Sequence, residues 1–160
     1  MRTDNGKVKQ IIVSIYFILI VMAVLLSTVF SKFSHLTSNP VLSFFVILAV
    51  LLVLFLGVYL IAKYFEYDSD GVKVVVTNRG LLLSEKLNYR EHQIEFDKAD
   101  LKAFKFKNYI VYKTLVLFIK SSSGRVNKEV FNVTLVNRKK RKYIRQSLSK
   151  MVKNNLQNKV

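Results

Sequence analysis

The chain of 160 residues contains no cysteine, no tryptophan, one proline and two histidines. The absence of cysteine excludes disulfide bonds, thiol catalysis, iron–sulfur clusters and thiolate zinc sites. The two histidines, His35 and His92, lie in different polar stretches, so they form neither a metal cluster nor an acid–base pair. We therefore expect a protein that is not an enzyme and that requires no cofactor and no metal.

Acidic residues are also scarce, since 10 Asp and Glu stand against 26 Lys and Arg, for a net charge of +16. A disordered basic tail is poor in apolar residues, whereas 51% of this chain is hydrophobic. Residues 11–30 and 41–62 contain no charged side chain. Each stretch is long enough to cross a hydrocarbon core of about 30 Å as a helix. The sequence thus predicts a two-span transmembrane hairpin within residues 1–63 and a second domain over residues 64–160.

The distribution of basic residues predicts the orientation of this hairpin. Arg2, Lys7 and Lys9 precede the first span and Lys63 follows the second, while the ten-residue link contains only Lys32. The positive-inside rule then places both termini in the cytoplasm, with the spans in the inner (cytoplasmic) membrane. A cleaved signal peptide is the alternative for the first stretch. Its length and the lack of an Ala-x-Ala site argue against that alternative.

After residue 63 the hydrophobic period changes to two, which is typical of half-buried strands. Glycine turns at Asp70-Gly71, Arg79-Gly80 and Ser123-Gly124 predict hairpins. Six or seven antiparallel strands are expected. Their apolar positions alternate at Val72, Val74 and Val76, within residues 81–89, at Phe104 and Phe106, and at Phe131, Val133 and Leu135. Residues 115–119 are apolar on both faces and so are expected to form a central strand. Between residues 97 and 112 two arrangements stay open: a strand pair with a turn at Lys107-Asn108, or one long bent strand.

A C-terminal helix is predicted over residues 137–154. Ile144, Leu148, Met151 and Val152 fall at i, i+4, i+7 and i+8, which forms one apolar stripe on a helix. Asn137 is the expected N-cap, and the pair at 154–155 is the expected stop. The fold class is therefore a transmembrane hairpin followed by a mainly β (α+β) cytoplasmic domain, an antiparallel barrel or half-open sandwich capped by an amphipathic helix.

The runs FEYDSDGVKVVVTNRG (65–80), KLNYREHQIEF (86–96) and KTLVLFIKSSSGR (113–125), with the closing basic helix, resemble a bacterial pleckstrin-homology-like (PH-like) domain. Two N-terminal spans before such a domain recur in small bacterial membrane proteins of this kind. The resemblance implies a seven-stranded barrel with one end plugged by the helix. It implies no ligand, because the bacterial members share no catalytic residue set.

The candidate site is a basic run at the start of the predicted helix. Cations at a helix N-terminus oppose the helix dipole, so a sequence selected only for stability would place them elsewhere. Contact with anionic headgroups or with another anionic partner would explain them, whereas a merely solvated face is the simpler interpretation. Nucleic acid is a weaker candidate, because only Tyr143 is interleaved with the bases. The candidate residues are Arg138, Lys139, Lys140, Arg141, Lys142 and Arg145.

Three functional hypotheses follow. The first is a membrane-anchored binding or scaffold module that contacts anionic lipid or an acidic protein partner. The second, by analogy with antiviral effectors, is a domain that senses an anionic nucleotide signal while the spans oligomerise and disrupt the membrane. The third is an accessory subunit of a membrane complex. The spans contain no ionisable side chain, which argues against a conducting pathway, and Gly57 is weak evidence for a homo-oligomer.

Overall fold

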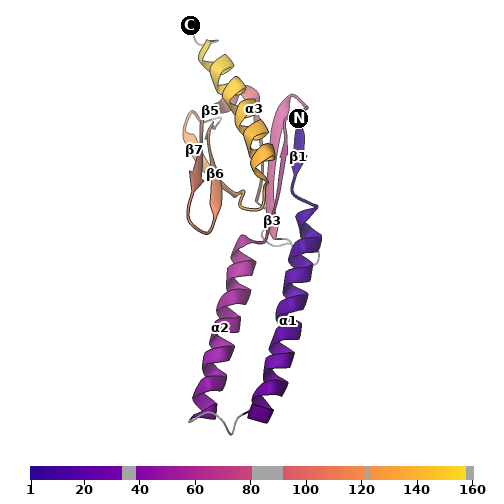
Figure 1. The fold of residues 1–160 in the computed structure, drawn as a ribbon. Helices are drawn as coiled ribbons and strands as arrows, with labels where there is room; N and C mark the ends of the chain where they lie inside the picture. The colour runs from indigo at the N-terminus through magenta and orange to yellow at the C-terminus, as the bar shows by residue number, and fades with distance from the viewer. Residues whose placement is uncertain (34–38, 81–91, 122, 158–160) are drawn as a thin grey trace.

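The computed structural model describes residues 1–33, 39–80, 92–121 and 123–157. Two long helices stand side by side, and a domain of two β-sheets and one helix lies at one end of the pair (Figure 1). The last helix runs away from the helix pair, so that the C-terminus lies at the far end of the domain (Figure 1). The predicted strand over residues 81–89 lies outside the described residues.

Helices α1 (Val8–Phe33) and α2 (Pro40–Ile61) confirm the two predicted helical stretches, and α1 extends beyond its expected bounds at both ends. The Asn39 side chain accepts the N–H of Leu42 at 3.3 Å, with Pro40 at the first helical position, so this pair starts α2 as its sequence suggests. Only 11% and 6% of the apolar windows of the two helices are buried. Both helices are therefore long and apolar enough to cross a membrane, and their side chains are not covered as those of a soluble core are.

The first sheet contains β1 (Arg2–Asp4), β2 (Lys63–Asp68), β3 (Lys73–Gly80) and β4 (His92–Asp97), paired antiparallel in that order. The sequence offered no reason to expect β1. Asn5 explains how this strand is held, because its side chain accepts the Phe65 N–H at 2.9 Å and donates to the carbonyl of Lys63 at 3.0 Å. The segment before α1 and the segment after α2 thus lie at the same end of the helix pair.

The second sheet contains β5 (Leu101–Asn108), β6 (Lys113–Lys120) and β7 (Val126–Asn132), also antiparallel. As predicted, residues 115–119 form the central strand. Gly124 has a φ of +80° in the β6–β7 turn, a conformation that favours glycine. Neither arrangement proposed for residues 97–112 is correct, since a short 3₁₀ turn (Lys98–Asp100) precedes one strand that ends at Asn108.

A closed barrel is not formed among the described strands, which separate into sheets of four and three. The sheets are joined by a pair of asparagines. The Asn78 side chain donates to the carbonyl of Asn132 and accepts the N–H of Asn132, each at 3.1 Å. The expected antiparallel helix-plus-sheet layout is therefore present, and full closure is not.

Two strand boundaries were predicted incorrectly. Val72 is exposed and precedes β3, although Val74 and Val76 are buried as expected. β7 ends at Asn132, so Val133 and Leu135 are not strand residues. The cause is local, because the Asn132 side chain accepts the N–H of Thr134 at 3.0 Å and so closes a turn immediately after the strand.

Helix α3 (Arg138–Gln157) covers the core with the predicted stripe. Ile144 and Leu148 are fully buried against residues of both sheets, and Met151 and Val152 pack beside them. Asn137 caps the helix by accepting the N–H of Lys140 at 2.8 Å. The predicted stop at 154–155 is wrong, because the Asn155 amide donates to the carbonyls of Lys98 and Leu101 and so docks the last turn.

Candidate functional site: a basic groove beside the end of the helix pair

The start of α3 lies close to the end of α2. The Asn132 side chain donates to the Leu60 carbonyl at 3.3 Å, which satisfies a free carbonyl in the last turn of α2. Leu135 packs beside Val58 and Ala62. Arg138 follows Leu135 by three residues, a chain reach of at most about 10 Å. The basic run therefore begins where the apolar helix pair ends.

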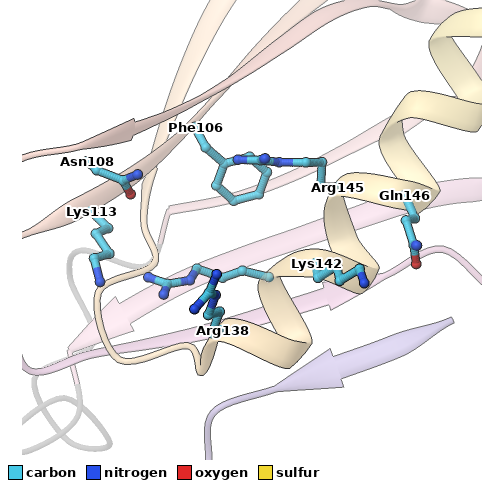
Figure 2. Close-up of a pocket in the computed structure, with 8 residues that line it drawn as sticks. Phe106, Asn108, Lys113, Arg138, Lys142, Arg145 and Gln146 are labelled. Carbon is cyan, nitrogen blue, oxygen red and sulfur yellow. The ribbon is translucent and has the colours of Figure 1, made fainter.

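A groove with a volume of about 670 Å³ lies between α3 and the β5–β6 hairpin. Figure 2 shows Phe106, Asn108 and Lys113 reaching it from the strands, and Arg138, Lys142, Arg145 and Gln146 from the helix. Arg141 also lines it. Five of the eight side chains are cationic and none of the eight is acidic. We call this site the basic groove; its residues are Phe106, Asn108, Lys113, Arg138, Arg141, Lys142, Arg145 and Gln146.

The cations of the basic groove are not neutralised by neighbouring carboxylates. Among the described residues, the side-chain ion pairs that the structure contains lie elsewhere, between Arg2 and Glu66, Lys73 and Glu95, and His92 and Glu129. The positive end of the α3 dipole adds to the same field, and the first turn of α3 contains no acidic residue. Among the described residues no carboxylate balances the positive potential of the groove, which therefore favours an anion.

Arg141 is the least favourably placed of these cations. Its Nη1 atom is buried and has no hydrogen-bond partner among the described residues. Burial first, and then repulsion by Arg138 and Arg145, lowers the pKa of its guanidinium. A buried donor without a partner costs about 1–3 kcal/mol. An anion with several oxygen atoms would supply the missing acceptor, because guanidinium groups bind such oxygens in pairs.

Phe106 provides an apolar floor for the groove. The Arg145 guanidinium carbon lies 5.2 Å from the centre of the Phe106 ring, a cation–π contact that orients the arginine side chain (Figure 2). The Phe106 ring contacts the guanidinium without accepting a conventional hydrogen bond from it, so the N–H groups of Arg145 can still donate to an acceptor oxygen. This arrangement suits a ligand with a phosphate-like group and a less polar portion.

The structure divides the six predicted site residues into two sets. Arg138, Arg141, Lys142 and Arg145 line the groove. Lys140 does not, because its ammonium donates to the carbonyl of Asp4 at the end of β1. Lys139 is exposed and is likewise not one of the groove residues. The helical period of 3.6 explains the division, since positions 138, 141, 142 and 145 share one face.

Four groove residues escaped the sequence analysis: Phe106, Asn108, Lys113 and Gln146. Phe106 was recognised only as a half-buried strand position. Lys113 lies opposite Asn108 across the β5–β6 pair, and this register was the one that the sequence left open. For Gln146 the helical spacing is a usable signal, because position 146 follows Lys142 by four residues and so lies on the same face of α3.

The described side chains do not support a metal site or an acidic counterpart of the basic groove. They contain no group of three or more His, Asp or Glu placed to hold a metal ion. A smaller depression of about 330 Å³ gathers Glu95, Asp97, Asp100 and Glu129, but Lys73 and Lys120 line it as well. Lys73 pairs with Glu95 at 3.0 Å. The carboxylates there are partly balanced, in contrast to the cations of the basic groove.

Comparisons with known proteins identify no relative on which a function could be based. No family model, no curated protein and no solved structure matches the chain.

Proposed function

We propose that the chain is a membrane-anchored, non-enzymatic binding protein whose basic groove takes the headgroup of an anionic phospholipid. One observation carries the proposal: five cations without carboxylate partners in the described part of the chain face a groove that opens where the apolar helix pair ends. Each base near a charged leaflet contributes about 1 kcal/mol to binding. A lipid phosphate in the leaflet at this end of α2 would lie beside these side chains.

The same proposal includes location and fold. Both termini lie on the cytoplasmic side of a bacterial inner membrane, as the distribution of Lys and Arg predicts. The domain is a PH-like arrangement in open form. Sheets of four and three antiparallel strands, followed by one C-terminal helix packed on the core, support this assignment.

The test uses the full chain in mild detergent and native mass spectrometry. Short-chain phosphatidylglycerol and phosphatidylcholine with identical acyl chains serve as probes. Neutralising two groove cations in Arg141→Gln/Arg145→Gln should weaken phosphatidylglycerol binding about 30-fold, since each base contributes about 1 kcal/mol. Binding of the anionic lipid should also fall as salt rises.

The matched control is Lys139→Gln/Lys150→Gln, which removes the same charge from exposed positions of α3 outside the groove. This control should bind phosphatidylglycerol as the unaltered chain does. Equal loss in the two double variants would mean that net charge alone attracts the lipid, and the groove assignment would be wrong.

A nucleotide-sensing effector is the second candidate, and the groove volume favours it. About 670 Å³ lies within the usual range for small-molecule sites, and Phe106 could contact a base. A soluble nucleotide that competes with phosphatidylglycerol, together with growth arrest on expression, would replace the lipid proposal with this one. Stable co-purification with another membrane protein would instead favour the accessory-subunit hypothesis.

A further inference from the structure

The turn between β5 and β6, residues 109–112, is unusually apolar. Its sequence is Tyr-Ile-Val-Tyr, whereas hairpin turns normally consist of Gly, Asn, Asp, Ser or Pro. Ile110 is fully exposed and Val111 is 63% exposed. The turn is nevertheless well formed, because the Tyr109 N–H donates to the Tyr112 carbonyl at 2.9 Å and the two rings stack with centres 4.5 Å apart. We call residues 109–112 the hairpin tip.

Hydrogen bonds connect the base of the hairpin tip to the end of α2. The Lys113 N–H donates to Thr134 Oγ1 at 2.9 Å, and this hydroxyl donates to Asn132 Oδ1 at 2.6 Å. Asn132 in turn donates to the Leu60 carbonyl at 3.3 Å. Three hydrogen bonds thus lead from the residue after the tip to the last turn of the apolar helix. The opposite ends of β5 and β6 lie near the last turn of α3, at the far end of the domain.

The side chains at the end of α2 have the composition of a membrane–water boundary. The Lys63 ammonium lies 5.2 Å from the centre of the Tyr59 ring, and the Arg79 guanidinium lies 4.6 Å from that of Tyr64. Tyrosines next to basic residues are enriched where a span leaves the hydrocarbon. The hairpin tip repeats this composition, with its two tyrosines flanked by bases at 107 and 113.

We propose that the hairpin tip is a second membrane contact, which enters the same leaflet that α2 leaves. Ile110 and Val111 lie in the lipid, and the tyrosine rings lie at the level of the headgroups, where their hydroxyls stay hydrated. The insertion removes two large exposed apolar side chains from water. This second proposal rests on the membrane anchoring in the proposed function, and it is independent of what the basic groove binds.

The insertion also has a consequence for the groove. Asn108 and Lys113 flank the tip and line the basic groove. An inserted tip therefore holds the groove at headgroup height and limits rocking of the domain about its connection to α2. The tip would act as a positioning element for the groove.

The test measures the depth of a nitroxide spin label. Because the chain has no native cysteine, Ile110→Cys and Val111→Cys each create a unique attachment site on the full chain. The matched control is Val72→Cys, an exposed valine in the β2–β3 turn at the opposite end of the sheet from Lys63. Each variant is reconstituted in bilayers of phosphatidylcholine alone, so that a failure of the groove to bind anionic lipid cannot change the result.

The expected result is frequent collision with oxygen and loss of collision with a water-soluble nickel chelate at positions 110 and 111. Position 72 should collide freely with the chelate. If positions 110 and 111 are as accessible to the chelate as position 72, the tip lies in water and the proposal is overturned. Low collision with both reagents would place the tip against a second copy of the chain and would overturn it equally.

Discussion

Single asparagine side chains connect the sheets, the last turn of α2 and the N-terminal segment of this protein. Asn78 and Asn132 connect the two sheets, and Asn132 also reaches the last turn of α2. Asn5 attaches the N-terminal segment to β2. A primary amide both donates and accepts, so one asparagine can satisfy two backbone groups where no strand pairing exists. These residues make the hydrogen bonds that strand ladders and helices leave unmade.

Tyr64 gives a prediction for alkaline pH. Burial, then the hydrogen bond that its hydroxyl donates to Glu66 at 2.9 Å, raises the pKa of Tyr64 to about 12. The folded state therefore holds this proton more tightly than the unfolded chain, whose tyrosine pKa is about 10. The resulting stability is complete below about pH 10 and is lost as the pH rises through about 12.

We expect Tyr64→Phe to remove the phenolate absorbance that appears near pH 12 and to make the alkaline fall in thermal stability shallower. Glu66→Gln serves as the control, since removal of the carboxylate should bring the Tyr64 pKa down toward its ordinary value. If the absorbance titrations of the unaltered chain and Tyr64→Phe differ near pH 10 instead, Tyr64 titrates at its ordinary pKa and the predicted shift is absent.

At the scale of elements, α3 combines a favourable core face with an unfavourable first turn. Ile144 and Leu148 are fully buried, which stabilises the helix through packing. Arg138 and Lys142 are exposed cations near its N-terminus, where each costs about 0.3–1 kcal/mol against the dipole. Asn137 offsets part of this cost by accepting the N–H of Lys140. The core face thus stabilises the element as a whole, while the proposed anion binding would account for the cations of its first turn.

This balance predicts opposite effects for two changes. Arg138→Gln/Lys142→Gln should leave the opening free energy of α3 unchanged or raise it by up to about 1 kcal/mol. Asn137→Ala should lower it by about 1 kcal/mol, because the cap is lost. Hydrogen exchange of the α3 amides in the full chain measures both. A marked destabilisation by the first variant would show that these bases stabilise the helix through contacts of their own.

At the scale of the whole molecule, β1 determines how the N-terminal segment is attached to the β-domain. The strand before α1 pairs with the strand after α2, with Arg2 opposite Asp68 and Asp4 opposite Glu66. The strand that precedes α1 and the strand that follows α2 therefore belong to the same sheet. In a membrane this pairing requires the N-terminal segment and the β-domain to lie on one side, in agreement with the charge distribution on which the cytoplasmic proposal depends.

Labelling of single cysteines tests this arrangement. Ser34→Cys, in the sequence between the two helices, and Val126→Cys, exposed on β7, should react with a membrane-impermeant maleimide from opposite sides. In intact cells we expect modification of position 34, with position 126 reacting only after lysis. Modification of both positions in intact cells would contradict the hairpin, and the reverse pattern would place the β-domain outside.

The sequence by itself determined the features that depend on local pattern. Two uncharged stretches predicted the long helices, the spacing of Ile144 and Leu148 predicted the buried face of α3, and the bases from 138 to 145 indicated four of the eight groove residues. Periodicity and composition act over a few turns of chain, so they can be read without knowledge of the fold.

Only the tertiary structure decided which distant segments meet. It placed β1 on β2, left the barrel open, brought Lys113 opposite α3 and directed Lys140 away from the groove. These outcomes depend on strand register and on packing between elements remote in sequence, where a shift of one residue reverses which side chains face inward. The local sequence around each residue does not specify the strand register or the packing between remote elements. The full set of groove residues could therefore be identified only from the tertiary structure.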